Sequence, residues 1–356
     1  MCRGYRFGED QVGRRRFASV LSLAVVGSLV LGACGDDDED AADTGDTTGS
    51  DETAAPAATE GDTGGDTGGD SGGDKPTIVL VQNAWTASAL NVEIAKQLIE
   101  TNLGNPVELT SIDENLMFGG LSSGELDAAL EFWPSGLSED EQKYLDDGTV
   151  VEIGELGAIG RIGWYVPDYV LEEYPELATW EGFKDPEVAK AFATAETGDN
   201  GRFLGTDPSY SQADEAIITN LELPYQVVYS GSEAATIAEL DSRVSAGEPI
   251  VMYWWAPTAA AGKYNLQKVE LPEYTDECYA DPAAIACDYP EDVLVKLASS
   301  GLEEKDPAVF AFLQNFQIST EDQLAMLPAA EIDGVPAADV AAEWIAANED
   351  IWSTWL

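Results

Sequence analysis

The chain has 356 residues, with 67 Asp or Glu against 17 Lys or Arg, and its formal net charge at pH 7 is −50. Such an acidic chain repels a phosphate backbone, which excludes nucleic acid as a partner. The sequence contains no His, which excludes Ser-His-Asp and Cys-His catalysis and leaves little for zinc beyond carboxylates.

The N-terminus has the pattern of an export signal. Three arginines at 14–16 precede an apolar run over 17–30, which is too short and too near the start for a standard membrane span. The run ends in Leu-Gly-Ala-Cys34, which is similar to a bacterial lipobox, in which the cysteine is acylated and begins the mature chain. We therefore expect a signal peptide over 1–33, exported by the Sec or the twin-arginine route, and lipidation at Cys34.

Residues 34–75 are acidic and rich in glycine, with almost no apolar side chain able to start a core. This composition predicts a disordered linker between the lipid and the folded body. We expect an extracytoplasmic protein that the lipid at Cys34 anchors to the bacterial cell membrane.

Two cysteines remain in the predicted folded body, Cys278 and Cys287. Outside the cytoplasm, two cysteines that enclose a short loop containing Asp-Pro are typical of a disulfide bond. A metal site would need more ligands than these, so we expect neither a metal nor a cofactor.

Strands and helices alternate from residue 76 onward. The apolar run at 77–82 predicts a buried strand, and Leu90, Ile94 and Leu98 share one face of the helix expected after it. The next predicted elements are a strand near 107–109, a helix over 114–121 and a strand over 125–134. This order of elements is typical of an α/β fold.

Two later strands are expected to cross between lobes, one over 157–167 and one over 293–297. The elements predicted between them are helices over 186–192 and 213–221, a strand over 226–229 and a helix capped by Ser232 and ended by Gly247. Predicted helices at Asp306-Pro307, 319–326 and 337–355 complete the chain. We expect one lobe to comprise 76–160 and 290–356, and the second lobe 161–289, with a ligand cleft between them.

The stretch from Pro249 to Pro257 combines a short apolar strand with two adjacent indoles. Ligands of open α/β sheets bind beyond the carboxyl ends of strands. Strand alternation directs Tyr253 and Trp255 to one face and Trp254 to the other. One indole is therefore expected to face a ligand and the other to lie in the core.

Four aromatic residues fall at predicted junctions between a strand or helix and a loop: Trp85, Trp133, Tyr210 and Trp255. A quaternary ammonium group carries positive charge but has no N–H to donate, so a site binds it through ring faces, each worth ~0.5–2 kcal/mol when desolvated. Ordinary core packing is the alternative for each ring taken alone. We assign core or lobe packing to the remaining indoles, Trp164, Trp180, Trp344, Trp352 and Trp355.

An enzymatic function has little support in the sequence. Carboxylates such as Glu125, Asp127 and Glu131 are compatible with glycoside hydrolysis, but 67 acidic residues bring pairs together by chance. No Gly-rich phosphate loop of useful spacing occurs. We therefore expect a protein that is not an enzyme.

Nearly all of the chain from Pro76 to its end resembles the substrate-binding proteins of glycine betaine/proline betaine/choline ABC transporters. Three stretches carry the resemblance: Glu-Phe-Trp133-Pro is similar to a Trp-Pro cage segment, Thr-Asp-Pro-Ser-Tyr210 to an Asn-Pro-Gly-Trp loop, and Tyr-Trp-Trp255-Ala-Pro to Tyr-x-Trp-Thr-Pro. Trp85 resembles the first-loop tryptophan of choline- and betaine-type members. Some members hold the ligand carboxylate with a His, which this chain lacks.

The resemblance implies an α/β, two-lobed periplasmic-binding-protein fold of type II, with two crossovers and an interlobe ligand cleft. It also implies capture of a quaternary ammonium osmoprotectant, glycine betaine before others, and its delivery to an ABC permease and its ATPase. Choline and carnitine are alternatives within the family, and a carbohydrate-binding lipoprotein is the alternative outside it.

Different polar groups are expected to hold a betaine and choline. A betaine carboxylate would be met by the backbone amides of 209–212 and the hydroxyl of Ser211. A choline hydroxyl would instead be accepted by a carboxylate such as Glu131 or Asp207.

Overall fold

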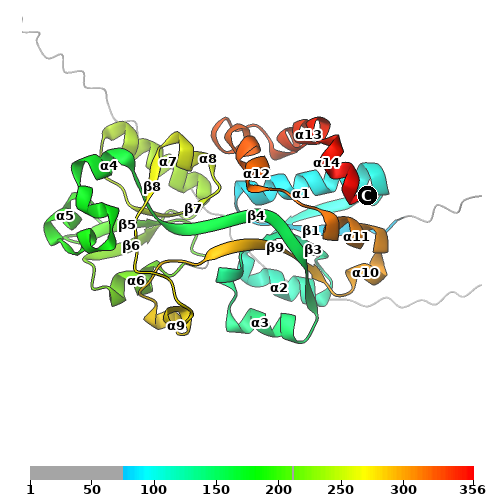
Figure 1. Ribbon diagram of the computed structural model, residues 1–356, viewed down its shortest axis with the longest axis horizontal. Coiled ribbons are helices and arrows are strands. Elements are labelled where there is room, and N and C mark those ends of the chain that lie inside the picture. The colour runs from blue at the N-terminus through cyan, green and yellow to red at the C-terminus, as the bar shows by residue number, and fades with distance from the viewer. Residues whose placement is uncertain (1–74, 211) are drawn as a thin grey trace, which may run out of the picture. The chain divides into compact units, whose positions relative to one another are not determined.

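The computed structural model describes residues 75–210 and 212–356 (Figure 1). The predicted signal peptide, Cys34, the linker up to residue 74 and Ser211 lie outside the described residues. Within the described part of the chain, no helix is both long and apolar enough to span a membrane.

The described strands form one continuous sheet. They are β1 (Ile78–Gln82), β2 (Val107–Ser111), β3 (Ala128–Phe132), β4 (Val150–Pro167), β5 (Gly201–Gly205), β6 (Tyr225–Tyr229), β7 (Met252–Ala256), β8 (Leu266–Lys268) and β9 (Glu291–Ser299). Their order is β2-β1-β3-β9-β4-β7-β5-β6, and β8 pairs with β4.

The sheet divides into two lobes at its two central strands. Strands β2, β1 and β3 pair in parallel on one side, and β7, β5 and β6 pair in parallel on the other. The long strands β4 and β9 pair antiparallel with each other and run between the two groups (Figure 1). We call the β1–β3 side the first lobe and the β5–β7 side the second lobe.

The two crossing strands predicted from the sequence are confirmed as β4 and β9. Because β4 continues unbroken from Val150 to Pro167, no strand end marks the predicted boundary at residue 160. The exact limits of the lobes stay a prediction.

Helices cover both faces of the sheet. They are α1 (Thr86–Leu98), α2 (Glu114–Ser123), α3 (Glu139–Asp146), α4 (Asp168–Glu173), α5 (Pro186–Ala191), α6 (Asp214–Asn220), α7 (Glu233–Ala246), α8 (Ala259–Lys263), α9 (Asp276–Tyr279), α10 (Leu302–Lys305), α11 (Pro307–Asn315), α12 (Thr320–Leu327), α13 (Ala337–Ala347) and α14 (Glu349–Trp352).

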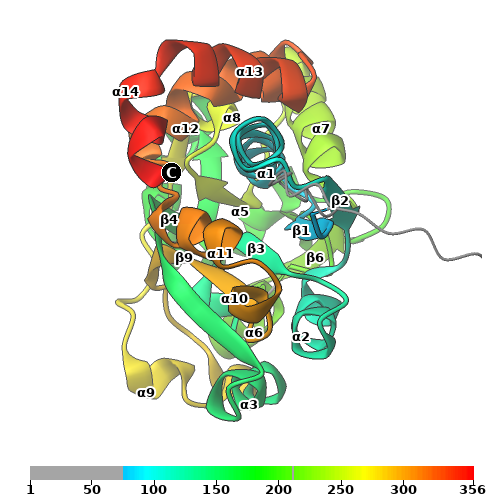
Figure 2. The same ribbon diagram turned by 90° about the vertical axis from the view of Figure 1, so that its right-hand side faces the viewer.

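The alternation of strand residues explains this two-sided packing. Leu80 and Ala128 belong to one buried cluster with α1, while their strand neighbours Val81 and Ala129 belong to another with α2. Figure 2 shows α1, α12 and α13 grouped together above the strands of the first lobe, with α2 and α3 below. The buried strands are apolar on both faces for this reason.

The helix signals in the sequence are confirmed at several ends. The Ser232 hydroxyl accepts the N–H of Ala235 at 3.1 Å, and Gly247 ends the same helix with φ +66°. The Asp306 carboxylate accepts two amides at the start of α11, whose first residue is Pro307. The predicted disulfide bond between Cys278 and Cys287 is also present.

The single helix predicted over 337–355 is wrong. Helix α13 ends at Ala347, and Asn348 leaves the helical conformation while its side-chain amide donates to the carbonyl of Trp344 at 2.8 Å. Asparagine competes with the backbone in this way and favours helix ends. The break brings Trp355 back onto the core, where its ring centroid lies 4.9 Å from that of Phe316.

Candidate ligand-binding site

A small pocket lies where the two lobes meet. It is lined by Trp85, Glu114, Trp133, Ser135, Gly136, Ile162, Tyr210, Tyr253 and Trp255. Five of these nine residues are aromatic.

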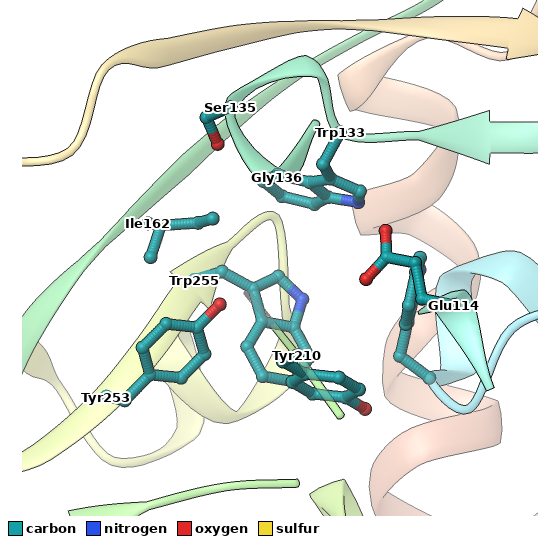
Figure 3. Close-up of a pocket in the computed structure, with 9 residues that line it drawn as sticks. Glu114, Trp133, Ser135, Gly136, Ile162, Tyr210, Tyr253 and Trp255 are labelled. Atoms are coloured by element: carbon teal, nitrogen blue, oxygen red, sulfur yellow. The ribbon is translucent and has the colours of Figure 1, made fainter. Parts of the chain in front are cut away.

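The aromatic residues reach this pocket from both lobes. Trp85 directly precedes α1 and Trp133 directly follows β3, so both belong to the first lobe. Tyr210 lies in the loop between β5 and α6, and Tyr253 and Trp255 lie on β7. Figure 3 shows the labelled rings around one space, with the carboxyl group of Glu114 at its side. The structure thus brings together the four rings that the sequence singled out, and adds Tyr253.

Tyr210 connects the indoles of the two lobes. The centroid of its ring lies 5.6 Å from that of Trp85, with an interplanar angle of 87°, and 5.7 Å from that of Trp255, with an angle of 84°. Its hydroxyl donates to the carbonyl of Ala84 in the first lobe at 3.2 Å. These edge-to-face contacts, which aromatic rings prefer, turn the rings to different angles around the pocket.

The two adjacent indoles of β7 lie in different surroundings. Trp255 lines the pocket, whereas Trp254 is fully buried and donates its indole N–H to the Thr258 hydroxyl at 2.8 Å. The two rings stack with centroids 4.4 Å apart. Trp254 therefore supports Trp255 from the core.

Glu131 holds two of the pocket indoles from behind. One carboxylate oxygen accepts the indole N–H of Trp85 at 2.6 Å and that of Trp133 at 3.2 Å. The other accepts from the side-chain amides of Asn91 at 2.6 Å and Gln323 at 3.3 Å. Since both oxygens are occupied and Glu131 does not line the pocket, the structure gives it a different place from the one expected for a choline hydroxyl acceptor.

The charge of Glu131 depends on what surrounds it. Burial raises the pKa of this carboxyl to about 7, while the four hydrogen bonds lower it. All four partners are N–H donors, which favour the ionised form. A cation in the adjacent pocket would favour it further, so the site combines ring faces with a buried negative charge behind them.

Glu114 is the carboxylic acid among the residues that line the pocket, and it was not predicted from the sequence. Burial, together with the carboxylates of Glu141, Asp292 and Glu131, raises the pKa of Glu114 to about 8. At neutral pH this side chain is therefore mainly a neutral acid, able to donate a hydrogen bond to an anionic oxygen. Nothing in the local sequence distinguishes it from the other acidic residues at helix starts.

The indole of Trp133 rests on the backbone of the crossing strand β4. A Cβ placed at Gly160 would lie 2.0 Å from Cζ3 and 2.5 Å from Cη2 of Trp133. No side chain fits there unless the indole moves. The glycine in this strand is thus required by the position of a pocket ring.

Comparison with known proteins identifies the family. Residues 76–347 match the family model described as the substrate binding domain of ABC-type glycine betaine transport systems. The chain belongs to this family.

Similar proteins agree with this assignment. A trimethylamine N-oxide-binding protein of Pelagibacter ubique (strain HTCC1062) is 25% identical over 285 residues, covering 78% of this chain and 90% of the relative. Lactococcal OpuAC, closed around glycine betaine, has a TM-score of 0.62 at 20% identity, covering 79% of this chain and 99% of that chain. A choline-binding protein in complex with choline has a TM-score of 0.63 at 17% identity, covering 79% of this chain and 91% of that chain. The likeness confirms the two-lobed periplasmic-binding-protein fold.

In this member of the glycine betaine family, the loop after β5 is arranged differently from the expectation for a betaine carboxylate. Asp207 accepts the backbone N–H and the hydroxyl of Ser209, and the Gln212 side-chain amide donates to the Asp207 carbonyl. Of the described residues in this loop, Tyr210 lines the pocket. Ser211 lies outside the described residues, so its role stays a prediction. In the described part of the chain, no cluster of three or more Cys, Asp or Glu is arranged to hold a metal ion.

A substitution at Gly160 tests whether β4 positions a pocket ring in this family member. We expect Gly160→Ala to displace the Trp133 indole and to lengthen or break its 3.2 Å hydrogen bond to Glu131. A crystal structure of the variant measures the shift. Gly262→Ala is the matched control, because a Cβ at that position meets no atom within 4 Å. An unmoved Trp133 in the Gly160 variant would contradict the argument.

Proposed function

We propose that this protein captures a compact trimethylammonium osmoprotectant, glycine betaine before others, and delivers it to an ABC permease and its ATPase. The observation that carries the proposal is the convergence of Trp85, Trp133, Tyr210 and Trp255 on one pocket. Membership of the glycine betaine family supports the same ligand class.

The methylated cation would be held by the ring faces. Each ring contributes ~0.5–2 kcal/mol when water is excluded, so four rings supply roughly 2–8 kcal/mol, against about 8 kcal/mol for micromolar affinity. The buried carboxylate of Glu131 behind Trp85 and Trp133 adds long-range attraction for a positive charge. Neither contribution needs an N–H on the ligand.

The anionic end of the ligand would meet Glu114. A carboxyl group with its pKa raised to about 8 keeps its proton at neutral pH and donates it to a ligand oxygen. An ionised carboxylate at this position would instead repel a betaine. Choline carries a hydroxyl in place of an anionic oxygen and would gain less from a charge-assisted bond.

Trimethylamine N-oxide is a second candidate ligand. Its oxygen is bonded directly to the methylated nitrogen, which makes it more compact than glycine betaine, and the relative from Pelagibacter ubique is named for binding it. The nine lining residues include no Arg, Asn or Asp, which argues against the carbohydrate alternative because sugar sites rely on such donors and acceptors.

The location and the absence of catalysis are part of the proposal. We infer that lipidation at Cys34 holds the protein at the outer face of the cell membrane, on the strength of the Leu-Gly-Ala-Cys34 pattern. The ligand is released chemically unchanged, as fits a family of solute-binding domains.

Isothermal titration calorimetry of the purified protein tests the ligand class. Glycine betaine and trimethylamine N-oxide are expected to bind with dissociation constants at or below the micromolar range, and choline, carnitine and proline betaine more weakly. A panel of sugars serves as the control and is expected to give no heat. Binding confined to sugars would overturn the proposal, and release of a chemically altered product would overturn the assignment as a non-enzyme.

The two indoles of β7 provide a matched pair of variants. We expect Trp255→Ala to weaken glycine betaine binding at least tenfold because it removes one face of the cage. Trp254→Ala removes a buried ring and is expected to lower the free energy of unfolding by about 3–5 kcal/mol, with a smaller effect on affinity in the protein that remains folded. Calorimetry and denaturant unfolding measure the two effects, and the reverse pattern would show that the other indole is the wall.

The raised pKa of Glu114 predicts a pH dependence of binding. The group has an ordinary pKa of 4.5 and a pKa of about 8 in this closed arrangement, so closure takes up a proton. The contribution of protonated Glu114 to ligand binding is complete below its ordinary pKa and is lost as the pH rises towards 8. Calorimetry from pH 5.5 to 8.5 should therefore show falling affinity for glycine betaine.

Glu114→Gln is the control for this dependence. Glutamine is neutral at every pH, so the variant is expected to show a shallower slope than the wild type. Burial also raises the pKa of Glu131 and of Glu233 to about 7, so the slope measured in the variant reports the titration of these two groups. Equal slopes in the two proteins would exclude Glu114 as the responsible group.

A further inference from the structure

Helix α1 begins without a cap of its own. Its N-cap residue is Trp85, which makes no side-chain capping hydrogen bond, and its first turn contains no acidic residue. Four N–H groups at a helix start lack partners within the helix. In this protein the partner for the first of them comes from the other lobe.

Glu233 supplies that partner. It is the first residue of α7 in the second lobe, and one oxygen of its carboxylate accepts the N–H of Thr86 at 2.9 Å and the Thr86 hydroxyl at 2.7 Å. Helix α7 does not use Glu233 for its own cap, because the Ser232 hydroxyl already accepts from Ala235. The carboxylate thus serves the first lobe while belonging to the second.

A second carboxylate makes the opposite connection. Glu331, next to α12 in the first lobe, accepts the N–H of Ala259 at 2.9 Å and the N–H of Ala260 at 2.8 Å, each with a different oxygen. Both amides belong to the second lobe. The two glutamates therefore cross the boundary between the lobes in opposite directions.

Both contacts adjoin the pocket rings without reaching the pocket. Thr86 directly follows Trp85, and Ala259 lies four residues beyond Trp255. Neither Glu233 nor Glu331 lines the pocket. Each glutamate fixes the segment that carries a ring from the lobe opposite its own.

The contacts exist only while the lobes are together. Glu233 is 6% exposed and Glu331 is half-buried, and burial raises the pKa of both carboxyl groups. When the lobes separate, the carboxylates and the amides are hydrated instead. Hydrogen bonds to ionised groups are the stronger ones in proteins, so their loss opposes opening.

We propose that Glu233 and Glu331 are positioning residues that act as a crossed pair of latches and set how long the closed protein retains its ligand. This inference rests on the proposed function for the identity of the ligand. The geometry of the two contacts carries the rest.

The rate of ligand release tests the latches directly. Stopped-flow tryptophan fluorescence of the full chain with glycine betaine is expected to give a dissociation rate about tenfold higher in Glu233→Ala and in Glu331→Ala, and higher again in the double variant. Glu233→Gln retains an acceptor and should recover part of the wild-type rate. Ser232→Ala, which removes the neighbouring cap within the second lobe, should leave the rate within about twofold of wild type. Unchanged rates in both alanine variants would overturn the proposal.

Hydrogen exchange provides a readout that needs no ligand. In the ligand-free protein, we expect either alanine substitution to speed exchange at Thr86 and at Ala259 and Ala260 together, because opening the lobes exposes all three amides. Faster exchange confined to the amides that the substituted side chain binds would indicate local capping and contradict a latch. Wild-type amides that exchange as fast as those of the variants would contradict it equally. If no methylated amine binds, the proposed function fails while this measurement still decides the latches.

Discussion

The aromatic pocket depends on one buried carboxylate. Glu131 is 1% exposed and accepts hydrogen bonds from two pocket indoles and from two amide side chains. Without it, four buried N–H donors would lack an acceptor, each at a cost of about 1–3 kcal/mol. The same group holds the indoles of Trp85 and Trp133 by hydrogen bonds and, when ionised, places a negative charge behind them, so ring geometry and electrostatics have a common origin.

The remaining walls follow from how the two lobes meet. Tyr210 touches Trp85 on one side and Trp255 on the other, and Trp254 stacks against Trp255 from the core. The first lobe thus contributes rings held by a carboxylate, and the second contributes rings held by packing. Neither lobe alone presents enough ring surface to surround a methylated cation, so the site is complete only where the two lobes meet.

Much of this arrangement could be predicted from the sequence. Apolar runs located the strands, and the aromatic residues at their ends located Trp133 and Trp255. Strand alternation indicated that Trp254 and Trp255 have different roles, and the resemblance to Tyr-x-Trp-Thr-Pro favoured Trp255 as the wall. These features are visible because they depend on local spacing, as do the caps at Ser232 and Asp306.

The features that the sequence did not reveal depend on distant partners. Glu131 and Glu114 are two of 67 acidic residues, and only burial among particular neighbours gives them a role. The reason for a glycine at position 160 of β4 is the indole of Trp133, which follows a different strand, β3. The crossing strands also have a geometric consequence. The register of the β4–β9 pairing shifts near Gly154 and Gly157, which both have positive φ. Such irregularities bend a strand locally, so the path by which β4 reaches the second lobe is set by a few residues of the ribbon that joins the lobes.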